Sequence, residues 1–314
     1  MIRIAFIAPL ESQVKLIEDV YKEHALREPC PEYIDYDFSV YVAKNYRGIP
    51  RQALAADVVV ARGLITAELK RIHPSLSVIE VPIGSEMAAT TFEAVKDHGK
   101  LPIAVIGSFN MVYASQGLGQ VLDVDLKQYV QESNEDFVIK RDVDRILAEG
   151  RRIIICGPIT HIHASCRECH PYLLGMSKLS IYDALTRARR EGVVRRLERE
   201  KAAQFQAVLN SAHEGIIATD SRNRITVFNA VAAELLGTSP AKALTASIED
   251  ILPMDEIAGA FLDSANAHRI VSLNGKYISI NKSRVSAGSH QLGHVLTLQK
   301  SSLTRKPTER RVSS

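Results

Sequence analysis

The chain has 314 residues, of which 46% are hydrophobic and 24% charged, and its formal net charge is +3. This length predicts about two domains of ordinary size. The small net charge does not by itself indicate nucleic-acid binding, and four cysteines in a chain of this length do not indicate a disulfide scaffold. No stretch approaches the ~18 apolar residues of a membrane span. We therefore expect a cytoplasmic protein that directly contacts neither membrane nor nucleic acid.

Strand-like and helix-like segments alternate through residues 1–178. Apolar, β-branched runs lie at 2–7, 37–42, 57–61, 77–81, 103–106 and 153–156, and helical spacing occupies segments such as 14–23, 67–72, 88–96 and 142–149. Continuous apolar strands separated by helices are typical of parallel sheets covered on both faces. The pattern changes near Gly84, where a longer helical segment precedes a second set of strands. The pattern predicts an α/β domain over residues 1–179, made of two Rossmann-like (flavodoxin-like) lobes at 1–83 and 84–178.

A ligand site is expected in the cleft between these lobes, because open α/β sheets bind ligands beyond the carboxyl ends of their strands. Small or polar residues follow the strands and let backbone N–H groups approach a ligand. The candidate residues are Pro9, Leu10, Arg62, Gly63, Thr66, Ser85, Ser108, Asn110, Pro158 and Thr160. Arg62 is suited to hold a carboxylate or phosphate. The alternative is that Arg62 pairs with a nearby acid such as Glu68 or Glu86.

The segment 161–170 reads HIHASCRECH and combines cysteine and histidine at metal or redox spacing. If it is helical, Cys166, Cys169 and His170 share one face, and His163 lies one turn away. Thiolates and imidazoles suit zinc or iron–sulfur centres, so a metal or redox sensor is one interpretation. The other is a helix that happens to carry these residues, and we expect no metal.

An enzyme is the other alternative. Two α/β lobes with a cysteine in each resemble the amino-acid racemases, which use paired thiols across a cleft. Cys156 ends a predicted strand as such a base requires, whereas Cys30 lies in a Pro-rich loop. No serine elbow, glycine-rich dinucleotide fingerprint or HExxH motif occurs. We therefore expect a protein that is not an enzyme and binds no cofactor.

Residues 180–212 are predicted to form one long helix. Apolar residues recur at three- and four-residue steps, at Ile181, Leu185, Ala188, Leu197, Phe205, Val208, Leu209 and Ala212. The middle is dense in Arg and Glu, which is typical of a solvated face, and Gly192 interrupts the pattern. A continuous helix can transmit a signal between domains, and its stripe favours a homodimer.

Residues 213–300 begin with a short strand (215–219), a polar turn (220–224), a second strand (225–228), Asn229 and a small helix that ends at Gly237. This order resembles the opening of a PAS sensory domain. A short helix at 247–252, a helix at 257–265 and strands at 269–273, 276–282 and 294–298 follow, with Asn274-Gly275 as a hairpin turn. The tail at 301–314 is polar and basic, and we expect it to be disordered.

Both parts together resemble the sensor half of the propionate-catabolism regulator family, which belongs to the sigma-54-dependent transcription activators. Its motifs occur here as Ala61-Arg62-Gly63, as 107–110 (GSFN), as 157–160 (GPIT) and in 180–188 (SIYDALTRA). Departures are Leu64 in place of a second Gly, Ser177-Lys178 in place of Ser-Gly, and 84–87 (GSEM) in place of Ser-Gly-x-Asp.

The resemblance implies a two-lobed sensor for 2-methylcitrate-like organic acids, followed by a helix and a PAS domain. We thus expect a small anionic metabolite as ligand and a role in signal transduction and transcription regulation. Family members continue into an ATPase and a helix-turn-helix. No Gly-x-x-x-x-Gly-Lys-Ser/Thr phosphate loop occurs here, and no helix-turn-helix candidate follows residue 300. Contact with the transcription machinery is therefore expected only indirectly, through an output domain or partner protein, whether the chain is a stand-alone regulator or part of a longer one.

Overall fold

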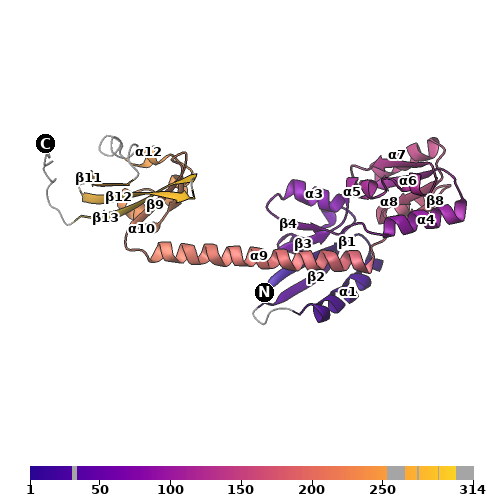
Figure 1. The fold of residues 1–314 in the computed structure, drawn as a ribbon, viewed down its shortest axis with the longest axis horizontal. Helices are drawn as coiled ribbons and strands as arrows, with labels where there is room; N and C mark the ends of the chain where they lie inside the picture. Colours follow the sequence, from indigo (N-terminus) through magenta and orange to yellow (C-terminus); the bar gives the residue numbers. More distant parts are fainter. Residues whose placement is uncertain (30–33, 253–265, 274–275, 289, 302–314) are drawn as a thin grey trace. The chain divides into compact units, whose positions relative to one another are not determined.

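The computed structural model describes residues 1–29, 34–252, 266–273, 276–288 and 290–301. The chain forms two compact units, Met1–Glu198 and Arg199–Ser314. The first unit contains two four-stranded parallel sheets, and the second contains one five-stranded antiparallel sheet (Figure 1). Within the described residues, no helix is both long enough and apolar enough to cross a membrane.

The first lobe is a parallel sheet between two layers of helices. Its strands are β1 (Ile2–Ala8), β2 (Tyr36–Val42), β3 (Val58–Ala61) and β4 (Ser77–Glu80), in the order β2-β1-β3-β4. Its helices are α1 (Val14–Arg27), α2 (Arg51–Leu54) and α3 (Leu64–Ile72), with 3-10 turns η1 (Glu11–Gln13) and η2 (Tyr46–Gly48). Helix α1 packs on one face of the sheet, and α2 and α3 pack on the other.

The second lobe repeats this arrangement. Its strands are β5 (Ile103–Gly107), β6 (Leu126–Val130), β7 (Ile153–Cys156) and β8 (His170–Leu173), in the order β6-β5-β7-β8. Its helices are α4 (Glu86–His98), α5 (Phe109–Ala114), α6 (Leu118–Val121), α7 (Asp136–Ala148) and α8 (Pro158–Ala164). Helices α4, α5 and α6 cover one face and α7 and α8 the other. Both lobes are flavodoxin-like, as the alternating pattern predicts.

The apolar runs identified in the sequence correspond to β1, β2, β3, β4, β5 and β7. The strands β6 and β8, which lie at the two edges of the second sheet, are not among the predicted apolar runs. Both are only partly buried, so neither contains the continuous apolar run of a central strand.

The long helix α9 spans Lys178–Ser211, and its N-terminal part belongs to the core of the first lobe (Figure 1). Ile181, Leu185 and Ala188 are buried against the same face of the sheet as α1. The helix is continuous through Gly192, as the prediction of one long helix requires. A Cβ atom at Gly192 would lie 2.6 Å from Cγ2 of Ile2, so glycine permits close packing of α9 on β1.

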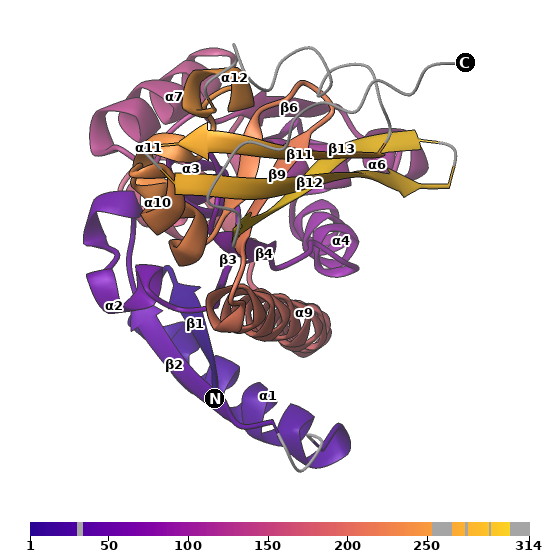
Figure 2. The same cartoon turned by 90° about the vertical axis from the view of Figure 1, so that its left-hand side faces the viewer.

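The second unit is an antiparallel sheet with short helices packed against it (Figure 2). Its strands are β9 (Gly215–Asp220), β10 (Ile225–Phe228), β11 (Asn266–Leu273), β12 (Lys276–Ala287) and β13 (His290–Lys300), in the order β10-β9-β13-β12-β11. Its helices are α10 (Ala230–Leu236), α11 (Pro240–Ala243) and α12 (Ile248–Ile251). This is the predicted PAS architecture. The predicted helix at 257–265, the turn at 274–275 and residues 302–314 of the tail lie outside the described residues.

Candidate ligand-binding site

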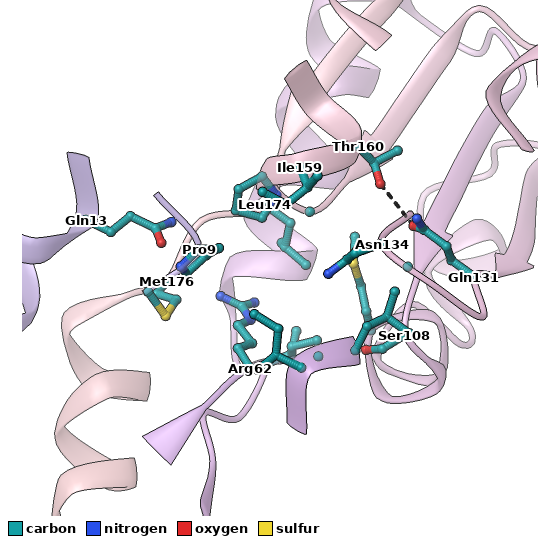
Figure 3. A pocket seen from close by; sticks show the side chains of 18 residues that line it. Pro9, Gln13, Arg62, Ser108, Gln131, Asn134, Ile159, Thr160, Leu174 and Met176 are labelled. Atoms are coloured by element: carbon teal, nitrogen blue, oxygen red, sulfur yellow. Dashed lines mark hydrogen bonds between the residues drawn. The ribbon is translucent and has the colours of Figure 1, made fainter. Parts of the chain in front are cut away.

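A cleft lies between the two lobes, beyond the carboxyl ends of their central strands (Figure 3). The segments that follow β1, β3, β5 and β7 contribute to its walls, as do residues that connect the lobes. The lining residues are Pro9, Gln13, Arg62, Gly63, Leu64, Ile65, Ile83, Gly107, Ser108, Met111, Gln131, Asn134, Gly157, Pro158, Ile159, Thr160, Leu174 and Met176. The cleft is therefore mainly apolar, with a few hydroxyl and amide groups and one guanidinium.

Arg62 extends from the end of β3 toward the middle of this group of side chains (Figure 3). The next residue, Gly63, has φ +64°, a conformation that favours glycine and turns the chain into α3. Nη1 of Arg62 donates to the carbonyl of Gly175 at 2.6 Å, and Nη2 lies 3.8 Å from Oε1 of Glu86. Both charged side chains are almost buried, at 12% and 11% exposure.

Two effects act on the Arg62 guanidinium. Burial lowers its pKa, and the charges of Glu86 and, to a smaller extent, Glu80 raise it. Because arginine has the highest pKa of the side chains, it remains protonated. Of the two acids considered from the sequence, Glu86 is the one that pairs with Arg62.

The second lobe presents a fixed set of hydroxyl and amide groups to the cleft. Thr160 Oγ1 donates to Oε1 of Gln131 at 2.9 Å (Figure 3). Nε2 of Gln131 donates to the Ser133 carbonyl at 2.9 Å. Asn134 Nδ2 donates to the carbonyl of Lys44 at 3.2 Å, which links the two lobes at the edge of the cleft. These groups are held in place by the protein and can orient a polar ligand.

Some buried polar atoms at the cleft have no hydrogen-bond partner in the described part of the chain. They include Nη2 of Arg62 and Oε1 of Gln13. Buried polar atoms are nearly always satisfied by protein or ordered water. A polar ligand with an acceptor atom would give Nη2 of Arg62 a hydrogen-bond partner.

The structure brings together part of the residue set predicted from the sequence. Pro9, Arg62, Gly63, Ser108, Pro158 and Thr160 line the cleft. The other four lie elsewhere. Leu10 packs against the core of the second lobe, and Thr66 is buried within α3. Ser85 is exposed before α4, and Asn110 is exposed on α5, where its Nδ2 donates to Glu80 at 2.6 Å. Ligand contact stays a prediction for all ten.

Sequence reasoning missed Gln13, Gln131 and Asn134. Gln131 directly follows β6, so the strand-end rule would have found it if the edge strand had been recognised. Asn134 lies in the loop after it. Gln13 is in the 3-10 turn before α1, where no strand-end signal exists.

The Cys/His segment is not one helix, contrary to expectation. Helix α8 ends at Ala164, Cys166 and Cys169 lie in the following turn, and His170 begins β8. The four candidates therefore share no helical face. His163 lies 3.2 Å from Asp136, and Cys169 Sγ donates to the Ala164 carbonyl at 3.2 Å. Among the described residues, no group of three or more His, Cys, Asp or Glu is placed to hold a metal ion.

Cys156 is fully buried at the end of β7, within the core between the sheet and α7 and α8. It does not line the cleft. Burial raises the pKa of its thiol, with a smaller contribution from Cys169, so the thiolate required of a racemase base is disfavoured. Cys30, the proposed second thiol, lies outside the described residues.

The sequence matches two families, in the order expected. Residues 35–198 match the family described as propionate catabolism activator. The chain belongs to this family. Residues 203–272 match the PAS fold. The chain thus carries two regulatory sensor domains, a propionate catabolism activator N-terminal domain and a PAS domain.

The chain is also similar to solved structures. The chain is similar to an NtrC family transcriptional regulator from Clostridium acetobutylicum, with 16% identity, a TM-score of 0.50, and coverage of 62% of this chain and 98% of that one. At this identity the likeness shows the fold alone. The chain is also similar to the PAS domain of the histidine kinase ThkA, with 23% identity, a TM-score of 0.25, and coverage of 28% of this chain and 99% of that one. It is similar to the PAS domain of Bordetella pertussis BvgS, with 12% identity, a TM-score of 0.28, and coverage of 33% of this chain and 88% of that one. No curated protein matches the chain.

Proposed function

We propose that this family member is a cytoplasmic sensor that binds a small organic acid between the two lobes of its first unit. The binding state is relayed through α9 to the PAS domain, which acts on transcription indirectly, through an output domain or a partner protein. The observation that carries the proposal is Nη2 of Arg62, a buried cationic donor in an otherwise uncharged cleft wall, without a hydrogen-bond partner among the described residues.

The cleft has the properties of a small-molecule site. It is concave, mainly apolar and has a few convergent polar groups. A carboxylate at Arg62 Nη2 would gain a charge-assisted hydrogen bond, which is stronger than a neutral one. Ser108 and Asn134 can donate to further oxygen atoms of the ligand, whereas Thr160, which donates its proton to Gln131, can accept from a ligand hydroxyl.

Thermal unfolding of the protein with a panel of organic acids tests the proposal. A ligand at a concentration ~100-fold above its Kd should stabilise the folded state by about 2.7 kcal/mol. Arg62→Ala should lose this ligand-dependent shift, measured against its own unliganded protein. Ser85→Ala changes an exposed residue outside the cleft and should retain the shift.

Arg62→Ala leaves Glu86 without its cation and can lower the yield of folded protein. Asn134→Ala provides a second test, because Asn134 lines the cleft and is only half-buried. It should weaken binding without removing it. The proposal is wrong if no acid stabilises the wild type, or if both variants respond as the wild type does.

We further propose that the protein is a homodimer through the solvent-exposed part of α9. Phe205 and Val208 are apolar and exposed at 56% and 65%, and both lie on the stripe predicted from the sequence. A second copy of the same helix would cover them. Sedimentation should show a dimer that Phe205→Glu with Val208→Glu converts to a monomer, whereas Gln206→Glu should leave it unchanged.

The proposed sensor does not catalyse. The buried Cys156 thiol supports this view, because it is outside the cleft and its raised pKa disfavours the thiolate. Purified protein should neither racemise acidic amino acids nor hydrolyse ATP. Racemisation that Cys156→Ser abolishes would contradict this proposal.

A further inference from the structure

The charge of the interlobe cleft limits the kind of acid that it can accept. Of the described residues that line the cleft, Arg62 carries the single charged side chain. The remaining polar groups are hydroxyls and amides, such as Ser108, Gln131 and Asn134. A ligand with several carboxylates would therefore meet one cation in a mainly apolar cavity.

The positive charge of Arg62 is already opposed by two acids. Oε1 of Glu86 lies 3.8 Å from Nη2, and both side chains are almost buried, so solvent screens this pair weakly. Glu80 is near enough to act on the same guanidinium. The local charge of these three groups is not positive. It does not favour an anion beyond the one carboxylate that bonds directly to Arg62.

Part of the hydrogen-bonding capacity of Arg62 is already used. Nη1 donates to the Gly175 carbonyl at 2.6 Å, whereas Nη2 has no hydrogen-bond partner among the described residues. The end-on fork of Nη1 and Nη2 is therefore partly occupied, and Nη2 is the nitrogen that a ligand carboxylate can engage. This geometry matches one oxygen of one carboxylate.

Glu86 is fixed beside Arg62 and cannot easily turn away to make room for a second anion. Its Oε1 accepts a hydrogen bond from Oγ of Ser180 at 2.8 Å, in the first turn of α9. Its Oε2 is buried without a hydrogen-bond partner within the described residues. The carboxylate therefore stays close to the guanidinium, and its charge persists at the cleft.

Resting on the proposed function, we propose that the cleft selects monocarboxylates with an apolar body and that Glu86 discriminates against di- and tricarboxylates. One carboxylate oxygen accepts from Nη2 of Arg62. The hydrocarbon part packs against the apolar walls formed by Met111, Ile159, Leu174 and Met176. Glu86 acts through Arg62 and does not touch the ligand.

Three probes that carry one, two and three carboxylates test this selectivity by calorimetry: 3-methylbutanoate, methylsuccinate and citrate. In the wild type, 3-methylbutanoate should bind at least about tenfold more tightly than the two polyanions, because each extra carboxylate would be desolvated in a mainly apolar cleft whose described lining offers no second cation. The ratio of affinities is the decisive measurement, since a purely structural role of Glu86 would weaken all probes alike.

Glu86→Gln removes the charge but retains the size of the side chain and an oxygen that accepts from Ser180. In this variant methylsuccinate should bind about tenfold more tightly than in the wild type, while 3-methylbutanoate gains less. Glu93→Gln is the matched control. Glu93 is exposed on the same helix α4, so its substitution changes net charge equally and should leave the ratio unchanged.

The outcomes separate this inference from the proposed function. If citrate or methylsuccinate binds the wild type more tightly than 3-methylbutanoate and Arg62→Ala abolishes that binding, the cleft is a ligand site but the monocarboxylate class is wrong. If Glu86→Gln leaves the ratio unchanged, the role of Glu86 is wrong. If no organic acid of any charge binds the wild type, the proposed function and this inference fail together.

Discussion

Asn229 shows how one side chain organises the start of the PAS domain. Its Oδ1 accepts from the backbone N–H groups of Ile216 and Ala232, both at 2.9 Å. Its Nδ2 donates to the carbonyls of Leu209 and Glu214, at 3.1 and 2.9 Å. All four bonding positions of the amide are used, and the residue is 1% exposed. It joins the end of α9, the start of β9 and the N-terminus of α10.

Replacing Asn229 with Asp should destabilise the PAS unit by about 2–4 kcal/mol. The carboxylate retains an oxygen that caps α10, but it cannot donate to the two carbonyls and brings a negative charge toward them. Ser247→Ala removes a cap on the short helix α12 and should cost only about 0.5–1 kcal/mol. Urea unfolding of the full chain measures both. An Asn229→Asp protein as stable as the wild type would mean that the two donor bonds contribute nothing.

His24 should make the first unit less stable in mild acid. It is fully buried between α1 and α9. Arginine has no acceptor, so Nη1 of Arg189 donates to Nδ1 of His24 at 2.9 Å. The neutral ring of His24 therefore carries its proton on Nε2 and donates it to Thr186 at 2.8 Å. Burial and, to a smaller extent, Arg189 lower the pKa of His24, and Glu28 opposes them.

The direction of this pH dependence follows from the difference in proton binding between the unfolded and folded states. Below pH ~6.5 the unfolded state takes up a proton on His24 that the folded state does not, so stability decreases as pH decreases toward the lowered folded pKa. Above pH ~6.5 the ring is neutral in both states and has no effect. His24→Asn keeps an acceptor for Arg189 and should show a weaker loss of Tm between pH 7.5 and 5.5. Burial also lowers the pKa of His294, but this residue is present in both proteins, so its contribution to the pH dependence is the same in both. Parallel pH profiles of the two proteins would contradict the assignment.

At the scale of elements, the sequence predicts every central strand of the two parallel sheets, but of their four edge strands it finds only β2 and β4. β1, β3, β5 and β7 are central strands with continuous apolar runs, and they place the cleft correctly. The edge strands β6 and β8 carry partly exposed residues and lack that signal. The strand-end rule gives the correct edge of each sheet, but it cannot tell which side chains turn inward. The rule therefore predicted two residues wrongly as lining the cleft: Thr66 faces the interior of the first lobe, and Asn110 faces solvent.

The long helix gives a second example. Its apolar residues at 181, 185 and 188 predict a buried stripe, but periodicity alone does not identify what covers it. The structure shows that it is the first sheet. Gly192 belongs to this contact, so what reads as a weak point in the sequence is a site of close packing.

Gly192→Ala should therefore destabilise the first unit, although alanine is normally favoured over glycine in a helix by about 1 kcal/mol. The new methyl group would lie 2.6 Å from Cγ2 of Ile2, and relieving this overlap should cost about 1–3 kcal/mol. A double-mutant cycle with Ile2→Ala identifies the cause, because the two substitutions should be less than additive if the methyl groups collide. A stabilised Gly192→Ala protein would show that α9 shifts to accommodate the methyl group without cost.

At the scale of the whole molecule, the cleft and α9 share one short segment of chain. Leu174 and Met176 line the cleft, and Gly175 between them accepts from Arg62. Ser177 then accepts from the backbone N–H of Ser180 at the start of α9. A ligand that engages Arg62 therefore acts next to the beginning of the helix. It can shift a conformational equilibrium only if its affinity differs between the two states.

The proposed relay predicts that the rotational phase of α9 matters. Residues 197–208 of α9 are exposed, whereas Gly192 is packed on the first lobe, so insertions belong after Glu200, where they disturb neither core. Two inserted alanines turn the following residues by about 200°, and four turn them by about 400°, close to the original phase. Hydrogen exchange of the PAS amides is measured with and without an acid that stabilises the wild type. The two-residue insertion should abolish the ligand-dependent change, and the four-residue insertion should largely retain it. Equal loss with both insertions, or no ligand-dependent change in the wild type, would mean that α9 is a tether rather than a transmitter.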